Sequence, residues 1–432
     1  MHDPNMLLLL DVVRALIVIL LASVVCGRIA LLIRQPRVVG EMVSGVLLGP
    51  TLLGAAAPET AAEIFNLQVK PVLYTIAVIG LTLFMFLVGA GQERIPSAAR
   101  EFVPPLVLAA SCLLAPLVLG GLTAFVLENE LNETGVSTPQ YALFVGGALS
   151  VTAFPMLARI LYERDMANTR FGELAMLAAS VDDAAAWCML AVISAMGLAG
   201  GMSSALTTIG LAVAFCGIVM IVVPRLLRRP AERAAATGKF PHELFAVVML
   251  LVLMAGWFTD YIGIYSVFGG FIAGLAMPRV PGFRKMIHDR MMDITAILLL
   301  PVFFAFSGLN TKLTGVWTWS FVGALVALLV AGFVGKYVFG LLAMRCLGHD
   351  WRTGSAMGGL MNARGLMILI FINVGLAHGI IGEKLFGMLA LIAVITTALA
   401  MPIYRRTSTL TREAEARNEA AEIIEDALLA RR

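Results

Sequence analysis

AASVDDAAAW, residues 178–187, places two adjacent carboxylates, Asp182 and Asp183, in the middle of an apolar run from about Gly172 to Leu198. A carboxylate at the centre of a bilayer costs about 2.5–3.5 kcal/mol on insertion scales, so the rest of the fold must offset two neighbouring ones. Acidic residues at that depth are typical of proton or ion sites. The stretch therefore predicts a membrane-spanning helix that carries such a site.

The composition of the chain indicates an all-α polytopic membrane protein. Of its 432 residues, 60% are hydrophobic and 14% are charged, whereas soluble domains carry about 25% charged residues. Its five cysteines and five histidines show no paired or metal-ligand spacing, so we expect no disulfide, resident metal or cofactor. We expect about thirteen transmembrane helices, at residues 6–26, 38–55, 71–92, 103–127, 140–161, 172–198, 204–227, 242–258, 261–277, 292–309, 317–345, 354–377 and 381–404.

The basic residues predict the orientation of these helices. With the N-terminus outside, 25 of the 31 lysines and arginines fall in cytoplasmic loops or in the tail 405–432, three fall outside, and three fall within spans. An excess of basic residues marks the cytoplasmic side. We therefore expect a multi-pass protein of the cell membrane whose first apolar segment is a span, not a cleaved signal, and whose C-terminus is cytoplasmic.

An odd number of spans permits two inverted repeats, about 6–198 and 242–404, joined by a linking helix at about 204–227 within a transmembrane domain of residues 1–404. Such repeats place the binding site where their broken helices meet. Break signals occur in span 5, from Ser150 to Pro155, and in span 12, where the sequence GGLMNARG includes Asn362 and Gly365. Pro155 removes a backbone donor, and a broken backbone is tolerated at that depth only inside protein or beside a cavity. We expect the two broken helices to cross.

Four helices place polar residues at a common depth. At about 1.5 Å per residue, Asp182, Thr152, Lys336 and Arg364 each lie about 13–15 Å from a cytoplasmic end, near the middle of the hydrocarbon core. Adjacent helical residues point about 100° apart. We therefore expect Asp183 to face an aqueous funnel and to hold a proton or a monovalent cation, while Asp182 pairs with Lys336. Thr152 and the freed carbonyls would supply neutral oxygens, which suit Na⁺ or K⁺.

Several of these residues also have a purely structural interpretation. Asp182 could act only as a partner of Lys336, and Lys336 could instead extend to the cytoplasmic edge. The hydroxyl of Thr152 could bond to its own helix, and Arg364 fits the neutralisation of helix ends better than ion binding.

Other apolar-segment residues are expected to be structural. Asp11 and Arg14, three residues apart, predict a self-contained ion pair in the first span. Gly270 and Gly274 predict close helix packing.

Other function classes fit the sequence less well. An intramembrane aspartyl protease needs two aspartates that share a proton, and adjacent residues on one helix cannot converge in that way, so we expect no enzyme. The sequence at Lys336 lacks a Walker A motif, so ATP does not drive transport. A channel or an organic-anion symporter on a similar inverted-repeat fold stays open as an alternative, as does a non-transporting receptor or scaffold. Nothing indicates binding to nucleic acid.

The ordered motifs resemble the monovalent cation:proton antiporter-2 family, which includes plant cation/proton exchangers and bacterial potassium-efflux and sodium antiporters. The resemblance covers about residues 35–402 and is carried by QPRVVGE at 35–41, GP at 49–50, SVTAFP at 150–155, VDD at 181–183, GIYSVFG at 263–269, PVFF at 301–304, GK at 335–336 and NARG at 362–365. It implies a homodimeric, elevator-type antiporter with a dimerisation domain and a mobile core. Such a protein exchanges Na⁺ or K⁺ for H⁺, and potassium efflux is the alternative within the family.

The resemblance also implies roles for single residues. Asp183 looks like the ion-binding aspartate and Asp182 like its partner, which pairs with Lys336. Thr152 and Arg364 look like the residues at the two helix crossings. The aspartate pair with Lys336 is more similar to the electrogenic, often sodium-using, members of the family.

Two features depart from the family pattern. Relatives often carry a glutamate a few residues after the arginine of span 12, but none follows Arg364 as far as Ile368. The candidate partners of Arg364 are therefore Glu173 and Glu41, which could also line a funnel or be solvated. The nucleotide-binding regulatory domain of the potassium-efflux members has no counterpart here, so we expect no gating through one.

Overall fold

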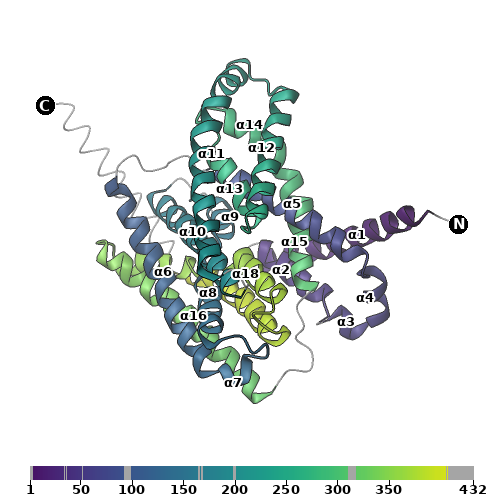
Figure 1. The fold of residues 1–432 in the computed structure, drawn as a ribbon, viewed down its shortest axis with the longest axis vertical. Coiled ribbons are helices and arrows are strands. Elements are labelled where there is room, and N and C mark those ends of the chain that lie inside the picture. The colour runs from purple at the N-terminus through teal and green to yellow at the C-terminus, as the bar shows by residue number, and fades with distance from the viewer. Residues whose placement is uncertain are drawn as a thin grey trace.

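The computed structural model describes residues 3–33, 35, 37–50, 52–91, 99–163, 166, 169–197, 201–309, 318–404 and 406. Over these residues the fold is all-helical, which confirms the predicted class (Figure 1). The helices are α1 (Pro4–Leu32), α2 (Arg37–Leu48), α3 (Leu53–Ala56), α4 (Pro58–Ile64), α5 (Val69–Ala90), α6 (Ala99–Val126), α7 (Glu128–Leu131), α8 (Thr138–Ser150), α9 (Phe154–Glu163), α10 (Arg170–Gly197), α11 (Gly201–Thr237), α12 (His242–Tyr261), α13 (Ser266–Leu275), α14 (Phe283–Ile294), the π-helical turn η1 (Thr295–Leu299), α15 (Leu300–Leu309), α16 (Trp319–Cys346), α17 (Trp351–Leu360), α18 (Gly365–Ala377) and a final helix, Glu383–Tyr404.

Nine helices in the described part of the chain are long and apolar enough to cross a bilayer. All thirteen predicted segments fall on helical structure, but four of them are not among these nine. Two of the four are interrupted, α13 has ten residues, and the fourth is α10. The number thirteen therefore stays a prediction. The predicted tail 405–432 lies outside the described residues, except for position 406.

Two of the predicted segments are broken helices, at the positions where the sequence predicts breaks. The chain leaves the helical conformation between α8 and α9, over Val151–Ala153, and again between α17 and α18. The N–H of Ala153 donates to the carbonyl of Ala363 at 3.1 Å. The second break therefore supplies a carbonyl acceptor for a backbone N–H of the first break. Backbone N–H and carbonyl groups that are buried outside a helix need such partners, because water cannot reach them.

The helices pack as two groups, which α11 connects (Figure 1). In the first group, α6 packs against α8, α10 and α16, and α16 also packs against α17. In the second group, α5 packs against α13 and α15, α2 against α1 and α15, and α12 against α13. The 37-residue helix α11 packs against α10 on one side and against α13 and α14 on the other. The predicted inverted repeats and domain boundaries are not tested by this packing and stay predictions.

Small residues allow the closest helix contacts in the second group. A Cβ built on Gly270 or Gly274 of α13 would overlap the backbone of α5, so their predicted role in helix packing is confirmed. The contact between α2 and α15 is as close, because Gly45 and Gly308 lie backbone to backbone. Glycine at such positions lets two backbones approach and gain van der Waals contact.

We expect Gly308→Ala to destabilise the protein by about 1–3 kcal/mol, because the added methyl group overlaps main-chain atoms of Gly45 and Val46 that cannot rotate away. Thermal unfolding of the detergent-solubilised protein measures the change. Gly323→Ala in α16 is the matched control, since a Cβ there meets nothing within 4 Å. The control should be neutral or stabilising by up to about 1 kcal/mol. Equal effects at the two glycines would show that the α2–α15 contact is not tightly packed.

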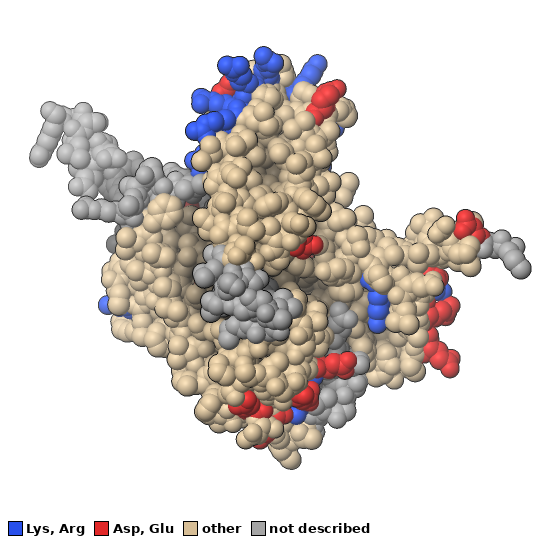
Figure 2. Space-filling model, viewed as in Figure 1, with Lys and Arg blue, Asp and Glu red and all other residues tan. Residues whose placement is uncertain are grey.

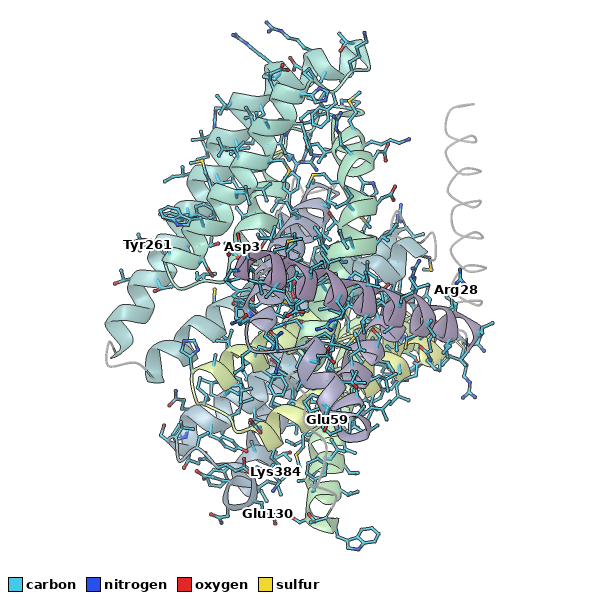
Figure 3. All side chains as sticks on the ribbon, turned by 90° about the vertical axis from the view of Figure 1, so that its right-hand side faces the viewer. Asp3, Arg28, Glu59, Glu130, Tyr261 and Lys384 are labelled. Atoms are coloured by element: carbon cyan, nitrogen blue, oxygen red, sulfur yellow. The ribbon has the colours of Figure 1, made fainter. Side chains whose placement is uncertain are left out.

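The pair of Asp11 and Arg14 in α1 is present, but the expectation that it is self-contained is wrong. Arg14 lies 3.0 Å from Asp11 and also 2.9 Å from Glu63, at the end of α4. The side-chain amide of Asn66 donates to the other carboxylate oxygen of Asp11 at 3.1 Å. The chain folds back after α2, and this return brings α4 alongside α1, so the pair becomes part of an inter-helix cluster. Figure 3 shows α1 crossing the side of the molecule between Asp3 and Arg28.

Asp350 starts the second broken helix. Its carboxylate accepts from the backbone N–H of Arg352 at 3.1 Å and of Thr353 at 3.3 Å, which is the usual N-cap arrangement. Partial burial opposes ionisation, but the hydrogen bonds from Thr353 and Arg352 outweigh it and lower the pKa of Asp350. The Asp350 carboxylate therefore stabilises the folded protein at pH values above the ordinary aspartate pKa. This stabilisation is lost as the pH falls through the lowered pKa of Asp350.

Candidate functional site at the helix crossing

The side chains that the sequence places at one depth also meet in space. Asp182, Thr152, Lys336 and Arg364 are fully buried, and Asp183 retains only 3% of its exposed surface. Asp182 and Asp183 come from α10, which packs against α8 and α9 of the first broken helix and against α18 of the second. The sequence indicated this meeting through the common depth and through the family resemblance, and the helix packing brings the side chains together.

Asp182 contacts its predicted partner Lys336 and also Thr152, which the sequence placed at the same depth as a possible ion ligand. Its Oδ2 accepts from the hydroxyl of Thr152 and lies 3.5 Å from Nζ of Lys336. Lys336 also donates to the carbonyl of Ser150. That carbonyl belongs to the last turn of α8, where a helix leaves its acceptors without intrahelical donors. Lys336 therefore neutralises Asp182 and caps the broken helix at the same time.

Asp183 has a different environment. Neither of its carboxylate oxygens accepts a hydrogen bond from the residues that the structure describes. The N–H of Phe154, at the start of α9, lies within electrostatic reach of the carboxylate, and the positive end of a helix favours a negative charge there. Asp182 adds a like charge on the next residue. Buried carboxylate oxygens without partners are costly unless a proton or a cation satisfies them.

The side chain of Asp183 is buried in this structure, and the expectation that it faces an aqueous funnel stays a prediction. Both α9 and α18 pack against α10, the helix that carries this carboxylate. Across the same boundary, Phe154 packs edge-on against Phe271 of α13, with ring centroids 5.6 Å apart. The sequence predicts the direction in which a side chain points from its own helix. It does not predict which residues of a neighbouring helix bury that side chain.

Arg364 does not pair with either of the expected glutamates. Its guanidinium donates to the carbonyl of Gly332 in α16, and its Nε and Nη1 have no hydrogen-bond partner among the described residues. Glu41 instead lies 3.5 Å from Arg37, one turn away on α2. A Cβ on Gly332 would lie 3.0 Å from Nη2 of Arg364, so a larger residue there would require the guanidinium to shift. The position of Arg364 is therefore set by α16, which also carries Lys336.

The remaining residues of the two breaks have local roles. The hydroxyl of Ser150 donates to the carbonyl of Gly147 at 2.8 Å. The amide of Asn362 donates to the carbonyl of Gly358 at 2.9 Å, while its buried Oδ1 has no partner among the described residues. Gly365 has a positive φ of 32°, and a Cβ there would overlap Met156 of α9. Pro155 is the second residue of α9, and backbone N–H groups in the first turn of a helix have no acceptor within the helix. The missing N–H of Pro155 therefore removes no helical hydrogen bond.

Sequence reasoning missed one residue of the crossing. The hydroxyl oxygen of Thr397, in the final helix, accepts from the N–H of Arg364 at 3.2 Å and of Gly365 at 3.3 Å. It therefore caps the start of α18 from a neighbouring helix. The signal was present as two adjacent threonines, Thr396 and Thr397, in an otherwise apolar run, but threonines in apolar helices usually bond to their own backbone.

The sequence matches the profile of a family described as "Sodium/hydrogen exchanger, transmembrane" over residues 16–405. It is 35% identical over 405 residues to the Na⁺/H⁺ antiporter NhaS4 of Synechocystis sp., covering 93% of this chain and 97% of that protein. It is also 35% identical over 391 residues to cation/H⁺ antiporter 17 of Arabidopsis thaliana, covering 88% of this chain. With the K⁺/H⁺ antiporter 1 of Saccharomyces cerevisiae it shares 32% identity over 384 residues, 86% of this chain.

The chain spans 47% of the length of the Arabidopsis protein and 43% of the yeast protein. The fold is similar to that of the sodium proton antiporter MjNhaP1 of Methanocaldococcus jannaschii, with a TM-score of 0.65, 17% sequence identity, and coverage of 93% of this chain and 97% of that one.

Proposed function

The chain belongs to the sodium/hydrogen exchanger family of transmembrane proteins, and from this membership we propose that it exchanges Na⁺ or K⁺ for H⁺ at the helix crossing by alternating access. It is a multi-pass cation/proton antiporter and not an enzyme. Relatives are named for Na⁺ and for K⁺, so the names leave both cations open. The transported ions are its substrates.

The observation that carries the proposal is the Asp183 carboxylate, whose two buried oxygens accept no hydrogen bond from the described residues. A buried carboxylate without partners is stabilised by a proton or by a bound cation. Both ligands need the same oxygens, so each excludes the other. This competition is the elementary requirement for antiport.

Neutral oxygens would complete the coordination of a dehydrated cation. The candidate ligand is the amide oxygen Oδ1 of Asn362, because it is buried without a partner in the described part of the chain. Oxygen ligands suit the alkali cations as hard ions. In this proposal Asp183 binds the ion, while Asp182, Thr152 and Lys336 hold the crossing in shape.

We propose that access alternates by movement of one helix group against the other. At the boundary between the two groups, the amide of Asn373 in α18 lies 3.4 Å from the hydroxyl of Ser307 in α15. The pair of Phe154 and Phe271 lies on the same boundary. Sliding of the group that holds α8–α10 and α16–α18 would carry Asp183 past this boundary. The other group would form the dimerisation domain of a homodimer.

We also propose that the basic end of the molecule is cytoplasmic. Lysines and arginines gather at the upper end in Figure 2, where α11, α12 and α14 meet, and acidic side chains gather at the opposite end. Glu59 and Glu130 lie toward that acidic end in Figure 3, and Lys384 donates there to the carbonyl of Glu130 at 3.2 Å. Basic residues concentrate on the cytoplasmic side of membrane proteins, so this end of the molecule would face the cytoplasm.

Exchange in proteoliposomes tests this function. The purified protein is reconstituted with an imposed proton gradient that a pH-sensitive dye reports, and pulses of Na⁺, K⁺, Li⁺ or choline are added. We expect Na⁺ or K⁺ to dissipate the gradient with saturable kinetics, and choline to have no effect, because it cannot enter a coordination sphere built for a bare alkali ion. Dissipation by every cation, or by none, would contradict the proposal.

A further inference from the structure

A pocket of about 540 Å³ lies at the basic end, away from the helix crossing. It is formed between α11 and the loop 276–282 that joins α13 to α14. Residues of α11 line it at intervals of four, from Met220 through Pro224 and Arg228 to Glu232. Its volume falls in the range of small-molecule sites, which is about 300–1,000 Å³.

The pocket combines an apolar wall with a basic rim. Met220 and Pro224 of α11 face Leu275, Pro278 and Val280 of the opposite side. The rim holds three guanidinium groups and one carboxylate, from Arg228, Arg279, Arg284 and Glu232. With all four groups ionised, the rim carries a net charge of +2, so an anionic ligand is favoured over a neutral one.

The three arginines are not equivalent. Arg284 donates to the carbonyls of Met277 and Pro278 and so fixes the loop. Arg228 is bound to Glu232 at 2.9 Å, but a guanidinium has five donors, and one carboxylate does not occupy them all. Arg279 is exposed and makes no hydrogen bond or ion pair with the described residues. Arg279 and the remaining donors of Arg228 therefore present N–H groups to the pocket.

The depth of the pocket matches the boundary between membrane and water. The sequence of α11 is almost wholly apolar up to Val223, and its arginines begin at Arg225. Below the pocket, the same side of α11 exposes Val213 and Ile221, and a Cβ on Gly217 would meet nothing within 4 Å. An open apolar track thus leads from the basic rim toward the hydrocarbon core.

We propose that this pocket binds an anionic phospholipid, with its phosphate on Arg228 and Arg279 and an acyl chain along the Val213–Ile221 face of α11. Arginine binds phosphate oxygens through paired N–H groups, and the apolar track explains why the ligand is a lipid and not a soluble phosphate. The lipid would bridge α11 to the α13–α14 loop. Since α11 connects the two helix groups, a bound lipid would favour one position of these groups relative to each other. This effect on the groups rests on the proposed function, but the lipid binding itself does not.

Lipid binding is measured on the purified full chain by native mass spectrometry and by thermal unfolding in detergent, with phosphatidylglycerol, phosphatidylcholine and glycerol 3-phosphate as probes. We expect phosphatidylglycerol to bind and to raise the unfolding temperature, and the other two to do so far less. Arg228→Gln with Arg279→Gln should weaken phosphatidylglycerol binding by about tenfold or more, because it removes charge-assisted hydrogen bonds.

The matched control is Arg225→Gln with Arg229→Gln, which removes the same charge from the same end of α11 but from outside the pocket lining. The control should bind phosphatidylglycerol as the wild type does. Equal weakening in both double variants would show general surface attraction and overturn the site. If glycerol 3-phosphate had the same effect as phosphatidylglycerol, the pocket would be a site for a soluble phosphate and not for a lipid. If phosphatidylcholine had the same effect as phosphatidylglycerol, the charge of the lipid would play no part in binding. None of these measurements depends on transport, so they fail independently of the antiport proposal.

Discussion

Asp183→Asn is expected to abolish cation/proton exchange. The amide is close in size to the carboxylate, but it neither takes up a proton near neutral pH nor carries the charge that stabilises a dehydrated cation. Both oxygens of Asp183 are buried and accept no hydrogen bond from the described residues, so they are available to a proton or a cation. Dye-reported exchange in proteoliposomes, with Na⁺, K⁺ and Li⁺ pulses, measures the loss.

The same substitution should leave the fold intact. It removes a buried charge that has no hydrogen-bond partner in the described part of the chain, so we expect the unfolding temperature to stay the same or rise. Asp293→Asn is the matched control, because Asp293 is exposed on α14, and it should exchange like the wild type. If the Asp183→Asn protein still dissipates the proton gradient with each cation, the assignment of the ion site is wrong.

Lys336→Met is expected to have the largest effect on stability. It leaves Asp182 fully buried without its counter-charge and removes the donor to the carbonyl of Ser150. Breaking a buried pair from one side typically costs about 3–5 kcal/mol, whereas removing both charges can be nearly neutral. The double variant Asp182→Asn with Lys336→Met should therefore recover most of the loss. Thermal unfolding of the four proteins in detergent gives the double-mutant cycle.

The double variant should also change transport. When Asp183 is loaded, the buried charges of Asp182, Lys336 and Arg364 leave a net positive charge at the crossing unless Lys336 releases a proton. Such a release would add a second proton to each cycle and make exchange electrogenic. Without Asp182 and Lys336 charges, we expect slower exchange that no longer responds to membrane voltage. Additive losses of stability in the cycle, or unchanged voltage dependence, would show that the pair is not coupled to the site.

Much of the site can be predicted from the order and spacing of residues along the sequence. The pair at 182–183 is predicted because charged residues in a long apolar helix are costly, and the pairing of Asp182 with Lys336 follows from their equal depth. The two breaks are also predicted, since proline at 155 and the glycines before Asn362 disfavour a continuous helix. These inferences need only the rise per residue and the cost of burying polar groups.

Other features depend on which helices become neighbours. Arg364 reaches the carbonyl of Gly332, not a glutamate, because α16 presents a glycine where the guanidinium lies. Glu63 joins Asp11 and Arg14 because the chain folds back onto α1. The hydroxyl of Thr397 donates to the carbonyl of Ala393 in its own helix, as a local interpretation expects, but its oxygen also caps a helix from another part of the chain.

The sequence by itself determined that this chain is a bundle of membrane helices with a buried acidic pair, two breaks and one compensating lysine, since each of these follows from local composition and depth. Only the tertiary structure decided that Asp183 is covered, that Arg364 bonds to backbone, and that α11 and a distant loop enclose a basic pocket. The physical reason is that depth and helical direction are properties of one segment. Burial and hydrogen-bond partners are properties of the segments packed against it, and many packings satisfy the same apolar pattern.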